Sequence, residues 1–228
     1  MKATRSIKVK SVLAILLIAV ELFAPLTAFH ADALAAPATA LPDGMSLGAQ
    51  LTQADLAYLQ DSLQYLRDQL PDWWQYVAEA MPVTLALDSS LDANGRAAVA
   101  DCCDEHGNGL ITVGQHFEQL AVSYRPSNQT VKAKRVIFLG LIIHEVTHIR
   151  DQREERFAAK TDRKSCIAVE SSGLTQELRF KRDLAASLAD DPTADPAFKA
   201  WLDEQIKIEA SDLRSRATWD LYCGAFES

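Results

Sequence analysis

The stretch that decides the fold is Val136-Ile137-Phe138-Leu139-Gly140-Leu141-Ile142-Ile143-His144-Glu145-Val146-Thr147-His148. Its first eight residues are almost wholly apolar, and the charged run 150–156 follows soon after its last histidine. This change from apolar to charged residues predicts one helix that leaves a hydrophobic core and emerges towards water. We expect the two histidines to lie where the helix emerges.

The spacing of the histidines predicts a metal site. Residues four apart lie one above the other on a helix, so the rings of His144 and His148 can converge on one ion. Glu145 lies about a third of a turn away, where it can reach a water in the open fourth position. Zinc lowers the pKa of such a water to about 7, and a nearby carboxylate can take its proton. We therefore expect one zinc ion per chain, with Glu145 as general base.

Gly140 lies one turn before His144 on the same face. A glycine inside a helix costs about 1 kcal/mol relative to alanine. Its presence indicates a close approach at this point, by a substrate or by a neighbouring strand, and ordinary packing explains it equally well.

The His-Glu-x-x-His pattern at 144–148 resembles the motif of the zincin superfamily of metallopeptidases. The resemblance covers residues 136–177 firmly. It implies an α+β, mainly helical, zincin-like domain, with a small sheet ahead of the metal-binding helix and helices at the C-terminal end. It also implies that a zinc-activated water hydrolyses a peptide or protein substrate.

The third zinc ligand depends on the branch of that superfamily. Gluzincins take a glutamate from a second helix some twenty or more residues on, and Glu170 follows His148 by 22 residues. The resemblance to this branch implies Glu170 as the ligand. Glu177, two turns further along the same face, is the alternative ligand, or else an acceptor that fixes the tautomer of a ligating histidine. Leu174 stands where the thermolysin pattern has an aspartate, so a close relation to thermolysin is not implied.

Two other branches fit the sequence less well. Metzincins have a glycine and a further ligand where this chain has Asp151 and Glu154. A third branch uses an aspartate a dozen or so residues after the second histidine. Asp162 is roughly placed for that role, but the surrounding motif is missing.

The first 35 residues have the pattern of an export signal. Four basic residues precede the apolar run 11–20, and Ala33-Leu34-Ala35 supplies small residues where a signal peptidase cleaves. We predict a signal peptide at 1–35 and an exported protein, either periplasmic or secreted. Cleavage after Ala31 is an alternative. Another is an uncleaved membrane anchor at 11–29, although Glu21 and Pro25 interrupt it.

The charge of the predicted mature chain narrows its partners. The whole chain has 23 basic and 31 acidic residues, and removal of 1–35 takes away four and two of these, which leaves a formal net charge of −10. Nucleic acids and anionic membranes bind concentrated Lys and Arg. We therefore expect no nucleic-acid partner and no stable membrane association after signal cleavage. The oligomeric state is left open by the sequence.

The even number of cysteines agrees with export, because disulfides persist in oxidising compartments. The four are Cys102, Cys103, Cys166 and Cys223. A bond between adjacent cysteines is strained, so we expect Cys102 and Cys103 to pair with the two distant ones. A direct bond between Cys166 and Cys223, with the other two free, stays open.

The remaining segments fit one domain at 51–228 after an irregular leader at 36–50. Leucines at helical spacing predict a helix at 52–69, and Pro71 begins another that runs to Met81. Alternating residues predict strands at 83–87, 97–100 and 109–113, and 109–113 is our candidate for an edge strand that pairs with substrate. The segments 165–190 and 197–222 predict two C-terminal helices.

Several polar side chains are further candidates. Tyr222, Arg179 and Arg214 are candidate oxyanion donors, whereas His106 and His116 near turns are expected to be solvated. Two other classes of function stay open beside a peptidase. One is an exported zinc-binding module without catalysis, which would not need Glu145. The other is a structural protein in which the motif is a coincidence.

Overall fold

The computed structural model describes residues 41–48, 51, 53–88, 90–93, 98–114, 129–156 and 162–226. These residues all lie within one unit of contacts, Pro37–Ser228. The predicted signal peptide, His116, and residues 36–40 and 49–50 of the leader lie outside the described residues. None of the helices in the described ranges has both the length and the apolar composition needed to span a membrane.

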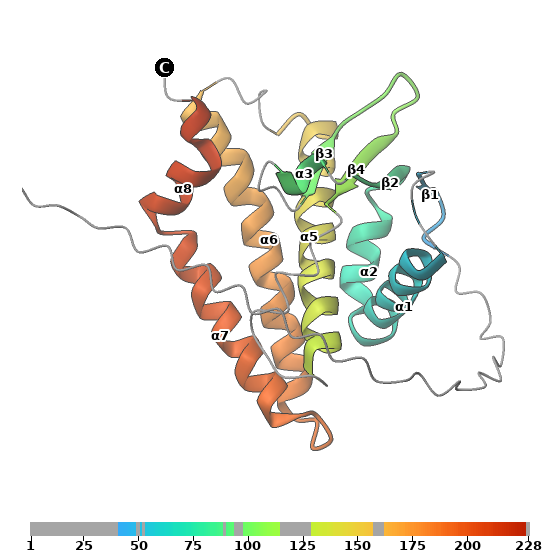
Figure 1. The fold of residues 1–228 in the computed structure, drawn as a ribbon, viewed down its shortest axis with the longest axis vertical. Helices are drawn as coiled ribbons and strands as arrows, with labels where there is room; N and C mark the ends of the chain where they lie inside the picture. Colours follow the sequence, from blue (N-terminus) through green and yellow to red (C-terminus); the bar gives the residue numbers. More distant parts are fainter. Residues whose placement is uncertain are drawn as a thin grey trace, which may run out of the picture. The chain divides into compact units, whose positions relative to one another are not determined.

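Helices make up most of the described chain, and a four-stranded sheet precedes the longest ones (Figure 1). The mainly helical α+β class is therefore confirmed. In chain order the elements are β1 (Met45–Leu47), α1 (Gln53–Gln69), α2 (Pro71–Ala78), β2 (Val83–Leu87), α3 (Ser90–Ala93), β3 (Ala98–Asp101), β4 (Gly109–Val113), α5 (Gln129–Arg153), α6 (Arg163–Ala189), α7 (Pro196–Asp212), α8 (Arg216–Cys223) and a 3₁₀ turn (Gly224–Phe226).

The sheet has the strand order β1-β2-β4-β3. The first three strands in this order are parallel, and β3 is antiparallel to β4. Ile111 of β4 therefore has a partner on both sides, Leu85 and Ala100. The prediction that 109–113 is an edge strand is wrong, and β3 is the edge beyond it in the described sheet.

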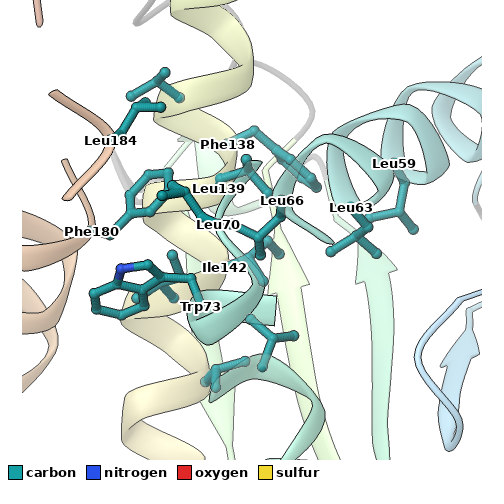
Figure 2. Packing of buried hydrophobic residues seen from close by; sticks show 14 of the residues in the cluster. Leu59, Leu63, Leu66, Leu70, Trp73, Phe138, Leu139, Ile142, Phe180 and Leu184 are labelled. Carbon is teal, nitrogen blue, oxygen red and sulfur yellow. The ribbon is translucent and has the colours of Figure 1, made fainter. Parts of the chain in front are cut away.

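Side chains of α5 form the centre of the core (Figure 2). Phe138, Leu139 and Ile142 of this helix lie between the leucines of α1 on one side and Phe180 of α6 on the other. A helix that is apolar on all its faces must be covered by other elements. Helices α1, α2, α6 and α7 and strands β3 and β4 all contact α5.

The point at which α5 meets water differs from the prediction. Every residue from Ile142 to Ile149 is buried, and Asp151 is only 1 % exposed. The histidines therefore lie inside the protein, one to two turns before the helix reaches the surface. The cause is α6, which covers the polar residues of this part of α5 as well as its apolar ones.

The last turn of α5 is held by Arg153. Its guanidinium donates to the carbonyl oxygens of Ala80, Met81, Pro82 and Gly107. These carbonyls lie immediately before β2 and β4, so one side chain joins the end of α5 to the beginning of two adjacent strands.

The other helices agree with the sequence except at their ends. Helix α2 ends at Ala78, because Pro82 disfavours helical backbone in the residue before it. Asp162 caps α6 in a capping box with Ser165. The predicted helix at 197–222 is two helices, since i→i+3 hydrogen bonds end α7 and Ser215 adopts extended backbone.

Candidate metal centre

Two histidines of α5 and one glutamate of α6 place three donor atoms around one point. Glu170 Oε2 lies 3.4 Å from His144 Nε2 and 3.7 Å from His148 Nε2. The ligand atoms of the three residues all lie within 4.8 Å of one another. The histidine rings are nearly perpendicular, with centroids 4.7 Å apart.

These separations fit a metal ion. Zinc binds histidine nitrogen and carboxylate oxygen at about 2.0–2.1 Å in a tetrahedron, so two such ligand atoms lie roughly 3.3 Å apart. The two measured separations are close to this value. The three side chains are almost fully buried, with 5–12 % exposure. Nitrogen and oxygen donors in this set suit zinc, although they do not identify it.

Glu177 lies on the opposite side of the His144 ring. Its Oε2 is 3.5 Å from His144 Nδ1, whereas Glu170 faces Nε2. The sequence left open whether Glu177 is a metal ligand or an acceptor that fixes the tautomer of a histidine. In the structure the two glutamates face different nitrogens of the same His144 ring. Glu170 therefore belongs to the group that could hold a metal ion, and Glu177 faces the other nitrogen of the His144 ring.

The surroundings raise the pKa of His144 and lower the pKa of Glu177. Burial alone would lower the pKa of His144, but hydrogen bonding to Glu170 and Glu177 raises it to about 10. Burial would raise the pKa of Glu177, but Lys181 and His144 lower it to about 2. The centre thus strongly favours positive charge at the position of the His144 ring.

Glu145 is next to the centre and 5 % exposed. Its negative charge contributes to the raised pKa of His144 and also to that of Tyr222. The carboxylate is therefore close enough to the His144 ring and the Tyr222 phenol to act on both electrostatically.

Two glycines allow α5 and α6 to approach closely. A Cβ atom on Gly173 would lie 2.7 Å from His144 Nε2, and one on Gly140 would lie 2.9 Å from Glu177 Oε1. Each glycine thus faces a larger polar residue of the other helix. The close approach expected at Gly140 is made by a neighbouring helix, because α6 packs along this face of α5. Sequence reasoning missed Gly173, although its position three residues after Glu170 puts it on the same helix face.

Tyr222 is the one oxyanion candidate that the structure links to the centre by charge. Although the residue is 46 % exposed, partial burial of its phenol, followed by the negative charges of Glu177 and Glu170, raises the pKa of that phenol to about 12. Arg179 is exposed and bonds Gln176 on its own helix. No described interaction places Arg214 at the centre.

The remaining sequence candidates have other partners. Glu154 pairs with Arg156, and Asp162 is the cap of α6. His106 is exposed beside Glu105, as expected. Asp151, which the metzincin pattern would replace by glycine, is buried and accepts a hydrogen bond from Ser172 of α6 at 2.6 Å.

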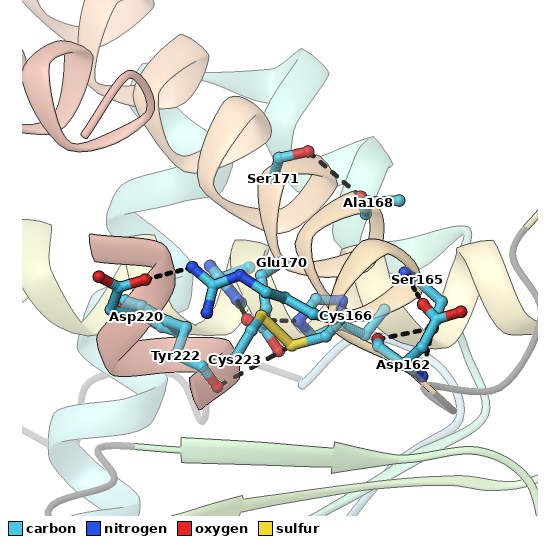
Figure 3. The surroundings of a disulfide bond; sticks show 12 residues. Asp162, Ser165, Cys166, Ala168, Glu170, Ser171, Asp220, Tyr222 and Cys223 are labelled. Atoms are coloured by element: carbon cyan, nitrogen blue, oxygen red, sulfur yellow. Dashed lines mark hydrogen bonds and ion pairs between the residues drawn. A yellow bond between two sulfur atoms is a disulfide. The ribbon is translucent and has the colours of Figure 1, made fainter. Parts of the chain in front are cut away.

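The cysteine pairing differs from the preferred prediction. Cys166 bonds Cys223 with a Cα–Cα distance of 5.8 Å, and the sulfur atoms of Cys102 and Cys103 lie at bonding distance from each other. The prediction that Cys102 and Cys103 each bond one of the two distant cysteines is wrong. Cys102 and Cys103 follow β3, whereas α8 brings Cys223 back to Cys166 at the beginning of α6. Figure 3 shows the Cys166–Cys223 bond one turn before Glu170 and adjacent to Tyr222.

No family model, no curated protein and no solved structure matches this chain. The functional argument therefore depends on the residues of the chain and their geometry.

Proposed function

We propose that the protein is an exported zinc-dependent metallopeptidase. In this proposal His144, His148 and Glu170 hold the zinc ion, and Glu145 is the general base. The observation that carries the proposal is the position of one Glu170 oxygen within 3.4 Å and 3.7 Å of two imidazole nitrogens. The motif at 144–148 and its resemblance to zincins supply the expected reaction.

A zinc ion bound there would polarise a substrate carbonyl and make a bound water acidic. Glu145 would take a proton from the attacking water and return it to the departing amine. The Tyr222 phenol is protonated at physiological pH, and its raised pKa keeps it so at alkaline pH, so that it would be able to donate a hydrogen bond to the developing oxyanion.

Strand β3 is the proposed docking edge for an extended peptide. It contacts α5 and forms one edge of the described sheet. An edge strand has backbone N–H and C=O groups with which a substrate backbone can pair in register. This edge takes the role that the sequence assigned to 109–113.

Export is supported by the sequence of residues 1–35 and by the Cys166–Cys223 pair, because such bonds persist in oxidising compartments. The signal peptide itself is a proposal from sequence.

The test begins with zinc content of the purified mature protein and of its Glu170→Ala and Glu177→Ala variants. We expect about one equivalent in the parent, loss in Glu170→Ala, and retention with weaker affinity in Glu177→Ala. Absence of zinc from a folded, oxidised parent exposed to Zn²⁺ would contradict the proposal.

Turnover separates a peptidase from an inert zinc-binding module. A peptide library is incubated with the zinc-loaded parent and with Glu145→Gln, and the products are identified by mass spectrometry. We expect Glu145→Gln to keep its zinc and to lose at least about 100-fold in rate, since general acid–base catalysis contributes about 10²–10⁴-fold. Cleavage at equal rates by both proteins would exclude Glu145 as the base.

A further inference from the structure

A buried lysine lies behind the candidate metal centre. Lys181 is on α6, one turn after Glu177, and its side chain is only 3 % exposed. In the described part of the chain it is the sole lysine or arginine among the buried residues. A buried ammonium is costly unless it is paired and hydrogen-bonded, so its position requires an explanation.

Two carboxylates pair with this ammonium. Lys181 Nζ donates to Glu177 Oε1 at 2.8 Å, and it also donates to Oε1 of Glu209 on α7. Both partners are nearly buried, with side chains 12 % and 15 % exposed. The three residues form a carboxylate–ammonium–carboxylate row that begins at the His144 ring and ends on α7.

We infer that Lys181, supported by Glu209, is a positioning residue for the metal centre and determines which glutamate binds the metal. The inference rests on the proposed function, since it presumes a metal held by His144, His148 and Glu170.

The geometry divides the two oxygens of Glu177 between two partners. Oε1 accepts from Lys181, and Oε2 faces His144 Nδ1 at 3.5 Å. When a metal displaces the proton from Nε2, the proton that remains on Nδ1 faces Glu177, and the Nε2 lone pair is directed towards the metal position beside Glu170. Lys181 thus fixes the tautomer and the ring orientation of His144 through Glu177.

The charges explain why a cation is needed at this position. Glu145, Glu170 and Glu177 all contribute to the electrostatic environment of His144 or Tyr222 within a buried volume. Among the described residues, Lys181 is the only lysine or arginine paired with Glu177, so without it the Glu177 carboxylate would compete with Glu170 for the metal. Because Lys181 holds one of its oxygens, Glu177 remains on the Nδ1 side.

The test is a double-mutant cycle on zinc affinity, measured by competition with a chromophoric chelator. Lys181→Met keeps the length of the side chain and removes its charge, and Glu177→Gln keeps the shape of its partner without the need for a cation. We expect each single variant to bind zinc about 10–100-fold more weakly, and the double variant to bind no more weakly than the weaker single one.

Arg182→Met is the matched control, because Arg182 is the next residue of α6 and is exposed. It should bind zinc as the parent does. The Co²⁺-substituted proteins give a second signal. Lys181→Met should change the visible absorption of bound Co²⁺, since altered ligand orientation changes these bands, whereas a lysine that only stabilises the helix packing would leave them unchanged.

If Lys181→Met is too unstable to purify, the same cycle is measured in the Glu209→Gln background, where one buried carboxylate is already neutral. Zinc affinity of Lys181→Met within about twofold of the parent, or losses that multiply in the double variant, would overturn the positioning role and leave the proposed function intact. A parent that binds no zinc would overturn both.

Discussion

Gly173 determines how closely the His144 ring can lie against α6. A methyl group at this position would lie 2.7–2.8 Å from three atoms of the ring, which is closer than real Cβ contacts. We predict that Gly173→Ala lowers the free energy of unfolding by about 1–3 kcal/mol, as overpacking does, and also weakens zinc binding. Urea denaturation and chelator competition measure the two effects.

Gly224→Ala is the control for that substitution. Apart from its chain neighbours, no atom of the described residues lies within 4 Å of a Cβ built at Gly224, and its backbone is helical. Alanine there should leave stability unchanged or raise it by up to about 1 kcal/mol. Equal behaviour of the two variants would show that the His144 ring does not need the space at Gly173.

Tyr222 gives a pH-dependent prediction at the same scale. The pKa of its phenol is raised to about 12, above the ordinary value of 10. As pH rises from 10 to 12 the unfolded chain therefore loses this proton before the folded protein does, and stability falls. We expect the parent to lose more stability over this interval than Tyr222→Phe in urea titrations. Parallel curves for the two proteins would contradict the shift.

At this scale the sequence predicts contacts between residues that are close in the chain, and it does not predict contacts between residues that are far apart in the chain. His144, Glu145 and His148 could be assigned because they share two turns of one helix. Lys181 and Gly173 could not, since their importance arises from the alignment of α6 against α5. For the same reason the sequence predicted a substrate or a strand beside Gly140, whereas its neighbour in the structure is Glu177 of α6.

At the scale of elements, the Cys166–Cys223 bond joins the first turn of α6 to α8 across 57 residues. A loop of this length loses about 4 kcal/mol of unfolded-state entropy on cross-linking, in the chain-entropy model. We predict that Cys166→Ala/Cys223→Ala is less stable than the parent by up to this amount, by thermal and urea unfolding.

The pair Cys102 and Cys103 is the matched control. Adjacent residues enclose almost no chain, so Cys102→Ala/Cys103→Ala should change stability far less. An equal loss in both double variants would show that loop closure is not the source of the stabilisation.

The ends of helices and strands were predictable where apolar residues recur over many residues and where a residue such as proline marks the end or the beginning. The leucines of α1 and Pro71 of α2 placed the beginning of both helices correctly from the sequence, whereas α2 ends three residues before the predicted Met81. Strand β1 was missed because its three residues are too few to show alternation. The break between α7 and α8 has no proline or glycine, so the sequence predicted one continuous helix there.

At the scale of the whole molecule, metal binding should stabilise the fold, because the proposed ligands come from both α5 and α6. Free zinc at 100 times its Kd contributes about 2.7 kcal/mol. For a domain of this size that is roughly 5–10 °C in Tm. We predict such a decrease when EDTA is added to the zinc-loaded protein, measured by calorimetry, and no change for His148→Ala.

The order of the strands could not be predicted, although three of them could be located. A parallel β2–β4 pair leaves β3 to join from the outside, and this pairing is set by tertiary contacts. The disulfide pairing was unpredictable for the same reason, since four cysteines allow three fully paired arrangements. The mainly helical class was implied by the resemblance at 136–177, and the helices that the apolar period predicted agree with it.

The four carbonyls bound by Arg153 have a consequence for how a metal would leave. They attach α5, with both histidines, to the beginning of β2 and β4, so these parts should move as one body. Glu170 belongs to α6, which Arg153 does not hold and which is joined to α5 by packing and by the hydrogen bond from Ser172 to Asp151. Release should therefore begin with a displacement of α6 that detaches the glutamate, while the histidines still hold the ion. Dissociation would then be a two-step process, whose first step is slowed by the disulfide between α6 and α8.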